Sequence, residues 1–173
     1  LDHGHARFVT DAFDQSLAAA RHDDIDVVAR SQQRADGGFV EIGVMRRSGT
    51  NPTAAAIGGL LVLQPLVEQP LLSSENRASA AQFLLVNFTD AGGLRANTQI
   101  PIADLLSTYT GLQTLVDLDA GQQVDAERVR QFVAPLQQPS GGYLAADWDE
   151  FADVEYSFYG VAVQGLLSGL AQS

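Results

Sequence analysis

Two carboxylates near the end of the chain, Asp153 and Glu155, are the residues best suited to holding a metal ion. Paired carboxylate oxygens are hard ligands, which favour Mg²⁺ or Ca²⁺ over Zn²⁺. Residues two apart on a helix point about 200° away from each other, so joint ligation requires a frayed first turn. The alternative is that both acids stabilise a helix N-terminus, with Asp153 as its cap.

Several aromatic residues lie close to these acids in the sequence or at related positions of the preceding repeat. They could line an apolar ligand pocket or stabilise a cation with their ring faces. Aromatic rings also fill the space between packed helices, which is the alternative interpretation. The candidate lining residues are Tyr109, Tyr156 and Tyr159, with Phe158 beside them.

A second acidic cluster, Asp147-Trp148-Asp149-Glu150, offers carboxylates for acid catalysis. Such a role requires that burial keep one carboxyl protonated. The cluster follows a Gly-Gly pair, where loops are exposed, and in an exposed loop these acids are simply solvated.

The composition excludes several classes of function. The 173 residues carry 21 acids against 10 basic residues, a net charge of −11, and no basic stripe, which argues against nucleic-acid binding. The absence of cysteine excludes a disulfide, a thiolate nucleophile and a thiolate zinc ligand. No apolar segment is long enough to span a membrane. The compartment stays open.

A repeat of about fifty residues positions these groups. In each copy a pair of glycines is followed, fifteen positions after the second glycine, by a hydroxyl residue. The copies are Gly37-Gly38-Phe39 with Thr53, Gly92-Gly93-Leu94 with Thr108, and Gly141-Gly142-Tyr143 with Ser157. A period of this length with apolar helical segments between the turns predicts stacked helix pairs. Each hydroxyl is expected just inside a helix start, where it satisfies free backbone groups.

Apolar spacing and end signals predict seven helices and no strand. The start signals include Asn51-Pro52 and Pro101, and the small residues Ala54–Ala56 with Gly58-Gly59 suit close helix contact. Helices that are apolar nearly all round are buried, and one-sided helices form a surface layer. We therefore predict an all-α fold, a single α/α toroid segment over residues 1–173 with about half a ring of helix pairs. The expected helices are 9–21, 24–34, 52–63, 74–88, 101–118, 125–134 and 154–170.

The segment from Asp153 to Tyr159 resembles the zinc-bearing repeat of protein prenyltransferase β-subunits, such as the geranylgeranyl transferase type II β-subunit, which reads Asp-x-Cys-Tyr-Ser-aromatic-aromatic. Asp104 to Tyr109 resembles a neighbouring Asp-x-x-Ser-Thr-Tyr repeat. Turns of the form Gln-x-x-x-Gly-Gly-aromatic, which begin here at Gln33 and Gln137, also occur in squalene and terpene cyclases. The resemblance covers about residues 30–170 and implies an α/α toroid with about six repeats when complete.

The resemblance implies a zinc aspartate at Asp153, but Glu155 stands where that family has its zinc cysteine. Asp147 and Glu150 stand where the family has basic residues that hold the lipid diphosphate. Two anions at those positions repel a diphosphate. We therefore expect a divergent relative that acts as a binding or scaffold module, with no cofactor, although the family would imply zinc.

The alternative is an isoprenoid-handling enzyme that a missing segment or a partner completes. It would be a geranylgeranyl or farnesyl transferase type, or a class II terpene cyclase type, in which Asp147 and Asp149 would belong to the acidic proton-donor motif. Three repeats make about half of a ring, so we expect a homodimer or the remainder of a longer chain as partner. The ligand expected from the resemblance is an isoprenoid or a peptide.

Overall fold

The computed structural model describes residues 31–170, and within that range the chain is helical. Isolated bridges occur in its turns, but the described residues contain no β-strand. The predicted helices 9–21 and 24–34 lie outside the described residues, apart from the last few positions of the second. Five α-helices lie wholly within the described residues: α3 (Thr50–Leu63), α4 (Ser74–Leu85), α5 (Leu105–Asp117), α6 (Ala126–Val133) and α7 (Val154–Leu170), with single 3-10 turns at Gln64–Leu66, Gly121–Gln123 and Ala134–Leu136.

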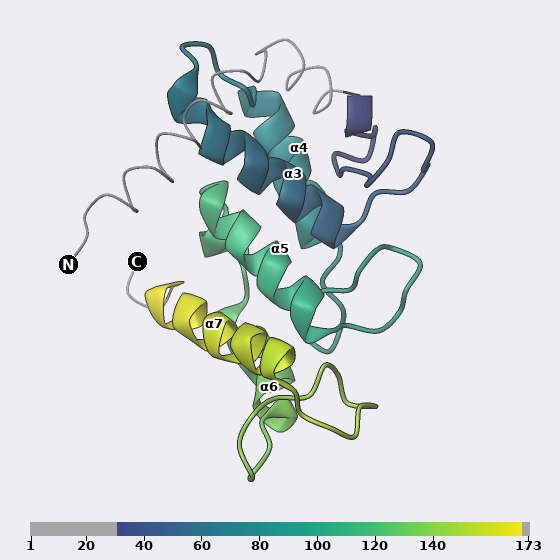
Figure 1. Ribbon diagram of the computed structural model, residues 1–173, viewed down its shortest axis with the longest axis vertical. Helices are drawn as coiled ribbons and strands as arrows, with labels where there is room; N and C mark the ends of the chain where they lie inside the picture. Colours follow the sequence, from purple (N-terminus) through teal and green to yellow (C-terminus); the bar gives the residue numbers. More distant parts are fainter. Residues whose placement is uncertain (1–30, 171–173) are drawn as a thin grey trace, which may run out of the picture. The chain divides into compact units, whose positions relative to one another are not determined.

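The five helices form two layers within the unit that begins at Gln32. Helices α3, α5 and α7 lie side by side, with α5 in the middle, while α4 packs on α5 and α6 packs on α7 (Figure 1). The core between α5, α6 and α7 includes Leu105, Leu112 and Val163, which are fully buried. The alternation of inner and outer helices therefore follows the prediction.

Two helix starts differ from the prediction. Helix α3 begins at Thr50 rather than at Pro52, with Gly49 as its N-cap in an extended conformation. Helix α5 begins at Leu105 rather than at Pro101, because the side chain of Asp104 accepts a hydrogen bond from the Ser107 N–H and caps the helix. The prolines misled the prediction because proline is tolerated throughout the first turn of a helix and in the loop before it.

A hydroxyl, buried in Thr53 and Thr108 and half-buried in Ser157, joins each Gly-Gly turn to the inner helix that follows it. The Thr108 Oγ1 accepts a hydrogen bond from the Leu94 N–H at 2.9 Å and donates one to the Asp104 carbonyl at 2.7 Å. The same two bonds join Thr53 to Phe39 and Gly49, and Ser157 to Tyr143 and Asp153. The constant spacing in the sequence is thus the spacing of one hydrogen-bonded motif, and each hydroxyl occupies the fourth helical position.

The first glycine of each turn has a backbone that L-residues rarely adopt. Gly37 and Gly92 have φ of +88° and +98°, and a Cβ on either would lie 2.2 Å from a backbone carbonyl oxygen of the next outer helix, that of Ser79 or Arg128. Gly141 has a similar φ of +96°, but nothing described lies within 4 Å of its added Cβ. The first two turns therefore pack on a following outer helix, and the third packs on none of the described helices.

Consecutive repeats are also joined by a main-chain hydrogen bond. The first N–H of α3, on Thr50, donates to the Ala96 carbonyl at 2.8 Å, and the first N–H of α5, on Leu105, donates to the Ala145 carbonyl at 2.9 Å. Ala96 and Ala145 stand two residues after the equivalent positions Leu94 and Tyr143. Each bond satisfies one of the amides that a helix N-terminus leaves without an internal partner.

We predict that Thr108→Val destabilises the fold by about 1–3 kcal/mol, because it leaves the buried Leu94 N–H without an acceptor. Thr108→Ser is the control, because it keeps the hydroxyl. Urea unfolding followed by circular dichroism measures both variants. Equal losses in the two would show that packing, and not the hydrogen bond, carries the effect.

The glycine turns allow a matched comparison. Gly92→Ala and Gly141→Ala both place a Cβ at a left-handed backbone position, which costs about 1–3 kcal/mol. Only Gly92→Ala adds a clash with Arg128, so we expect it to lose roughly 1–3 kcal/mol more. Urea midpoints in dilute protein measure the difference, and identical midpoints would contradict the described contact.

Candidate functional site

The three candidate tyrosines come together between the first turns of α5 and α7. Tyr109 stacks on Tyr159 with ring centroids 5.4 Å apart and an interplanar angle of 23°. Tyr156 meets Tyr159 edge-on at 5.8 Å, and Phe158 meets Tyr109 edge-on at 5.5 Å. We call these four residues the aromatic cluster. Edge-to-face and offset geometries of this kind stabilise aromatic pairs beyond simple burial.

The aromatic cluster is partly core and partly surface. The three tyrosines are partly buried and pack against the α5–α6–α7 core, whereas the Phe158 side chain is 57% exposed. Core packing therefore accounts for the buried part of these rings, and a ligand-lining role stays a prediction. The rings fill space between two inner helices, and they also present an aromatic surface to the outside.

Burial and nearby carboxylates raise the pKa of two phenols of the cluster, those of Tyr156 and Tyr159. Burial raises the pKa of Tyr156, and the negative charges of Asp104, Glu155, Asp153 and Asp149 raise it further. Burial also raises the pKa of Tyr159, together with the hydrogen bond that its hydroxyl donates to Glu155 Oε1 at 2.9 Å. A raised pKa for a phenol means that the neutral form is favoured. The aromatic surface therefore lies in a negative field.

The two proposed metal ligands already have partners within the protein. Asp153 Oδ1 accepts a hydrogen bond from the Tyr156 N–H at 2.7 Å, as an N-cap carboxylate does, and Glu155 Oε1 accepts one from Tyr159. Residues 31–170 contain no cluster of three or more His, Cys, Asp or Glu that could hold a metal. Tetrahedral zinc needs a fuller set of nitrogen and sulfur donors, so these residues do not fit the zinc that the family implies. A metal at this pair stays a prediction.

The acidic cluster at residues 147–150 lies in the loop before α7, which we call the acidic loop. It is largely exposed, and its hydrogen bonds hold the loop in shape. Asp149 is partly buried, and its carboxylate accepts hydrogen bonds from the Ala145 N–H at 3.2 Å and the Glu150 N–H at 2.9 Å. Asp147 and Glu150 are exposed, and Trp148 is 66% exposed. Nothing in this loop provides the burial that would hold a carboxyl protonated for acid catalysis.

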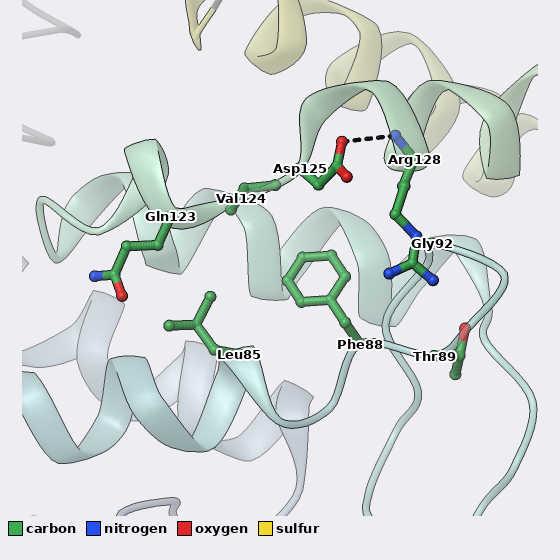
Figure 2. Close-up of a pocket in the computed structure, with 8 residues that line it drawn as sticks. All are labelled: Leu85, Phe88, Thr89, Gly92, Gln123, Val124, Asp125 and Arg128. Atoms are coloured by element: carbon green, nitrogen blue, oxygen red, sulfur yellow. Dashed lines mark hydrogen bonds between the residues drawn. The ribbon is translucent and has the colours of Figure 1, made fainter.

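The structure contains a cleft that the sequence analysis did not identify. It has a volume of about 330 Å³ and lies between the end of α4 and the start of α6 (Figure 2). Its two charged residues make structural bonds: Asp125 Oδ1 accepts from the Arg128 N–H at 3.1 Å, and the Arg128 guanidinium donates to the Asp90 carbonyl at 2.6 Å. No sequence signal marks it, because its lining comes from two repeats: Leu85, Phe88, Thr89, Gly92, Gln123, Val124, Asp125 and Arg128.

Alternating inner and outer helices, joined by Gly-Gly turns with a common hydroxyl clamp, define the class of α/α toroid proteins. A family model described as "Prenyltransferase alpha-alpha toroid domain" matches residues 56–172. The chain belongs to this family.

A solved structure shows the same fold. The chain is similar to Candida albicans protein geranylgeranyltransferase-I complexed with GGPP, with 20% sequence identity and a TM-score of 0.67 over 82% of this chain. The match covers 42% of that chain, so this chain spans less than half of its length. A search of curated proteins finds no match. Within residues 31–170, no helix combines the length and apolarity needed to cross a bilayer.

We predict that Glu155→Gln lowers the pKa of Tyr159, because it removes a negative charge and a strong acceptor beside the phenol. Glu127→Gln on α6 is the control and should leave the Tyr159 titration unchanged. Tyrosine ring carbon shifts measured by NMR against pH distinguish the residues. An unchanged Tyr159 titration in Glu155→Gln would show that this hydrogen bond does not form.

The raised pKa of Tyr159 also predicts how the stability of the protein changes with pH. The folded pKa of Tyr159 lies above 10.0, the ordinary value for a tyrosine, so the folded protein holds this proton more tightly than the unfolded chain does. Its stabilising contribution is complete below pH 10.0 and is lost as the pH rises through the folded pKa. In Glu155→Gln, urea midpoints should fall less between pH 9 and pH 11, a window of about one pH unit on each side of 10.

Proposed function

We propose that this chain is a binding module of the prenyltransferase toroid family that holds a basic peptide segment on its aromatic cluster. The observation that carries the proposal is the combination of a partly exposed aromatic cluster with surrounding carboxylates. A ring face attracts a cation, and a Lys or Arg side chain adds an apolar stem that packs against the rings.

The charges near the cluster favour a cationic ligand over an anionic one. Four carboxylates act on Tyr156, and the whole chain carries a net charge of −11. A negative field raises the local concentration of cations and speeds their association. The same field disfavours an isoprenoid diphosphate, whose leaving group carries several negative charges.

The acidic loop supports the same conclusion. Asp147 and Glu150 occupy the positions at which the family resemblance implies basic residues, and both are exposed at the start of α7. A catalytic prenyl transfer needs positive groups that stabilise the leaving diphosphate. An isoprenoid-handling enzyme, completed by further sequence, is the second candidate, and the family match favours it.

The test compares two probes by isothermal titration calorimetry with the full chain. We expect an arginine-rich hexapeptide to bind, and we expect its affinity to fall with added salt because the attraction is electrostatic. Farnesyl diphosphate should bind weakly at best. A glutamate hexapeptide is the control for non-specific peptide binding. Tight binding of farnesyl diphosphate with no binding of the basic peptide would overturn the proposal and favour the enzyme.

A substitution series locates the binding surface. Tyr109→Ala should weaken binding of the arginine-rich peptide about tenfold, because a cation over an aromatic face contributes about 0.5–2 kcal/mol. Tyr109→Phe keeps the ring and should bind nearly as well. If both variants bind like the wild type, the peptide occupies a different acidic surface.

A further inference from the structure

The second Gly-Gly turn differs from the first at two positions that meet the next outer helix. In the first turn, the Gln33 side chain donates to the Gly37 carbonyl at 3.1 Å and to Ser79 Oγ on α4 at 3.3 Å. Phe88 stands at the place of Gln33 in the second turn, and Arg128 of α6 stands at the place of Ser79. Phenylalanine has no hydrogen-bonding group in its side chain, so this amide bridge is absent from the second turn.

The presence of phenylalanine at this place leaves a backbone acceptor unused beside the cleft of Figure 2. The Gly92 carbonyl is the equivalent of the Gly37 carbonyl, but no residue in the range 31–170 donates a hydrogen bond to it. Gly92 lines the cleft, and Leu85, Phe88 and Val124 supply its apolar wall. A ligand with an apolar body and a hydrogen-bond donor would therefore match both features of the lining.

Arg128 brings a positive charge to the same cleft without a carboxylate to neutralise it. Its guanidinium is held by the hydrogen bond to the Asp90 carbonyl at 2.6 Å. It forms no ion pair within the described part of the chain, whereas Arg130 pairs with Glu127 at 3.4 Å. The Asp125 carboxylate bonds the Arg128 backbone N–H, and Figure 2 shows the guanidinium at the other end of the side chain. The guanidinium is therefore complementary to an anionic group on a ligand.

From these observations we propose that the cleft binds a small 2-hydroxy acid with an apolar side chain. The ligand carboxylate pairs with the Arg128 guanidinium, and the ligand hydroxyl donates to the Gly92 carbonyl. The apolar side chain of the ligand packs on Leu85, Phe88 and Val124. The cleft volume of about 330 Å³ lies at the lower end of the range of about 300–1,000 Å³ that is usual for small-molecule sites.

The net negative charge of the chain opposes this ligand much less than it opposes a diphosphate. A carboxylate carries a single charge and contacts the guanidinium directly, whereas a diphosphate carries several charges. Exposed acids farther away than about 8–10 Å are largely screened at ordinary salt concentrations. The cleft shares no lining residue with the aromatic cluster, so binding here goes beyond the proposed function and is independent of it.

Titration of the full chain with 3-phenyllactate, followed by amide NMR, tests the proposal. We expect saturable shifts with a dissociation constant of about 1 mM, because the cleft is small and open to solvent. The shifts should concentrate at residues 88–93 and 123–128, which include the lining of the cleft. Unshifted amides in these two segments at about 10 mM ligand would overturn the proposal.

Two related probes separate the groups of the ligand. 3-Phenylpropanoate lacks the hydroxyl and should bind about three- to tenfold more weakly, because it cannot donate to the Gly92 carbonyl. 3-Phenyllactamide lacks the negative charge and should bind at least about tenfold more weakly, because a charge-assisted hydrogen bond is stronger than a neutral one. Binding of the neutral amide as tightly as 3-phenyllactate would show that the guanidinium does not recognise a carboxylate, and the proposal would be wrong.

Matched variants test the two side chains that distinguish this turn. Arg128→Met at an exposed position should keep the fold and weaken 3-phenyllactate binding at least about tenfold. Arg46→Gln, at an exposed arginine outside the cleft, makes the same change in net charge and should bind like the wild type. Phe88→Gln restores the residue of the first turn, so the introduced amide should occupy the Gly92 carbonyl and abolish binding. Wild-type affinity in Arg128→Met, or an equal loss in Arg46→Gln, would contradict a site at this cleft.

Discussion

One hydroxyl in each repeat fixes the relation between a turn and the helix that follows it. It accepts from the amide after the Gly-Gly pair and donates to the carbonyl at the helix N-cap, so neither backbone group is left unpaired. The turn geometry depends on this clamp, because the left-handed glycine must approach the next outer helix at a fixed place. The turn geometry in turn determines where each inner helix lies beside its neighbour.

The clamp also explains why the aromatic cluster and the acids lie together. Asp104 and Asp153 precede their inner helices by the same single position, and Tyr109 and Tyr156 follow within the next two turns. Side-by-side packing of α5 and α7 therefore brings the rings of one repeat against those of the next. The capping carboxylates lie at the same end and contribute the negative field around Tyr156. The cluster with its acidic surroundings is a consequence of the repeat.

Much of this arrangement could be predicted from the sequence, because a fixed spacing reports a fixed hydrogen-bonded motif. The constant gap to Thr53, Thr108 and Ser157 predicted the repeat, and apolar periodicity predicted the alternation of inner and outer helices. The exact starts of α3 and α5 could not be read from Pro52 and Pro101, because proline tolerates several places near a helix start. The outer cleft was missed because its lining comes from two repeats that only the packing brings together.

The bond between the first amide of one inner helix and the loop carbonyl of the next repeat has a consequence for how such chains grow. It uses only main-chain atoms, so this bond itself imposes no choice of side chain on either partner and can recur at every junction of the array. The energy of the array is then a sum over units and their nearest neighbours. Helix α5 is the one described inner helix with an inner neighbour on both sides, so it takes part in two of these nearest-neighbour interactions. The folded array therefore gains the most stability when the middle repeat forms.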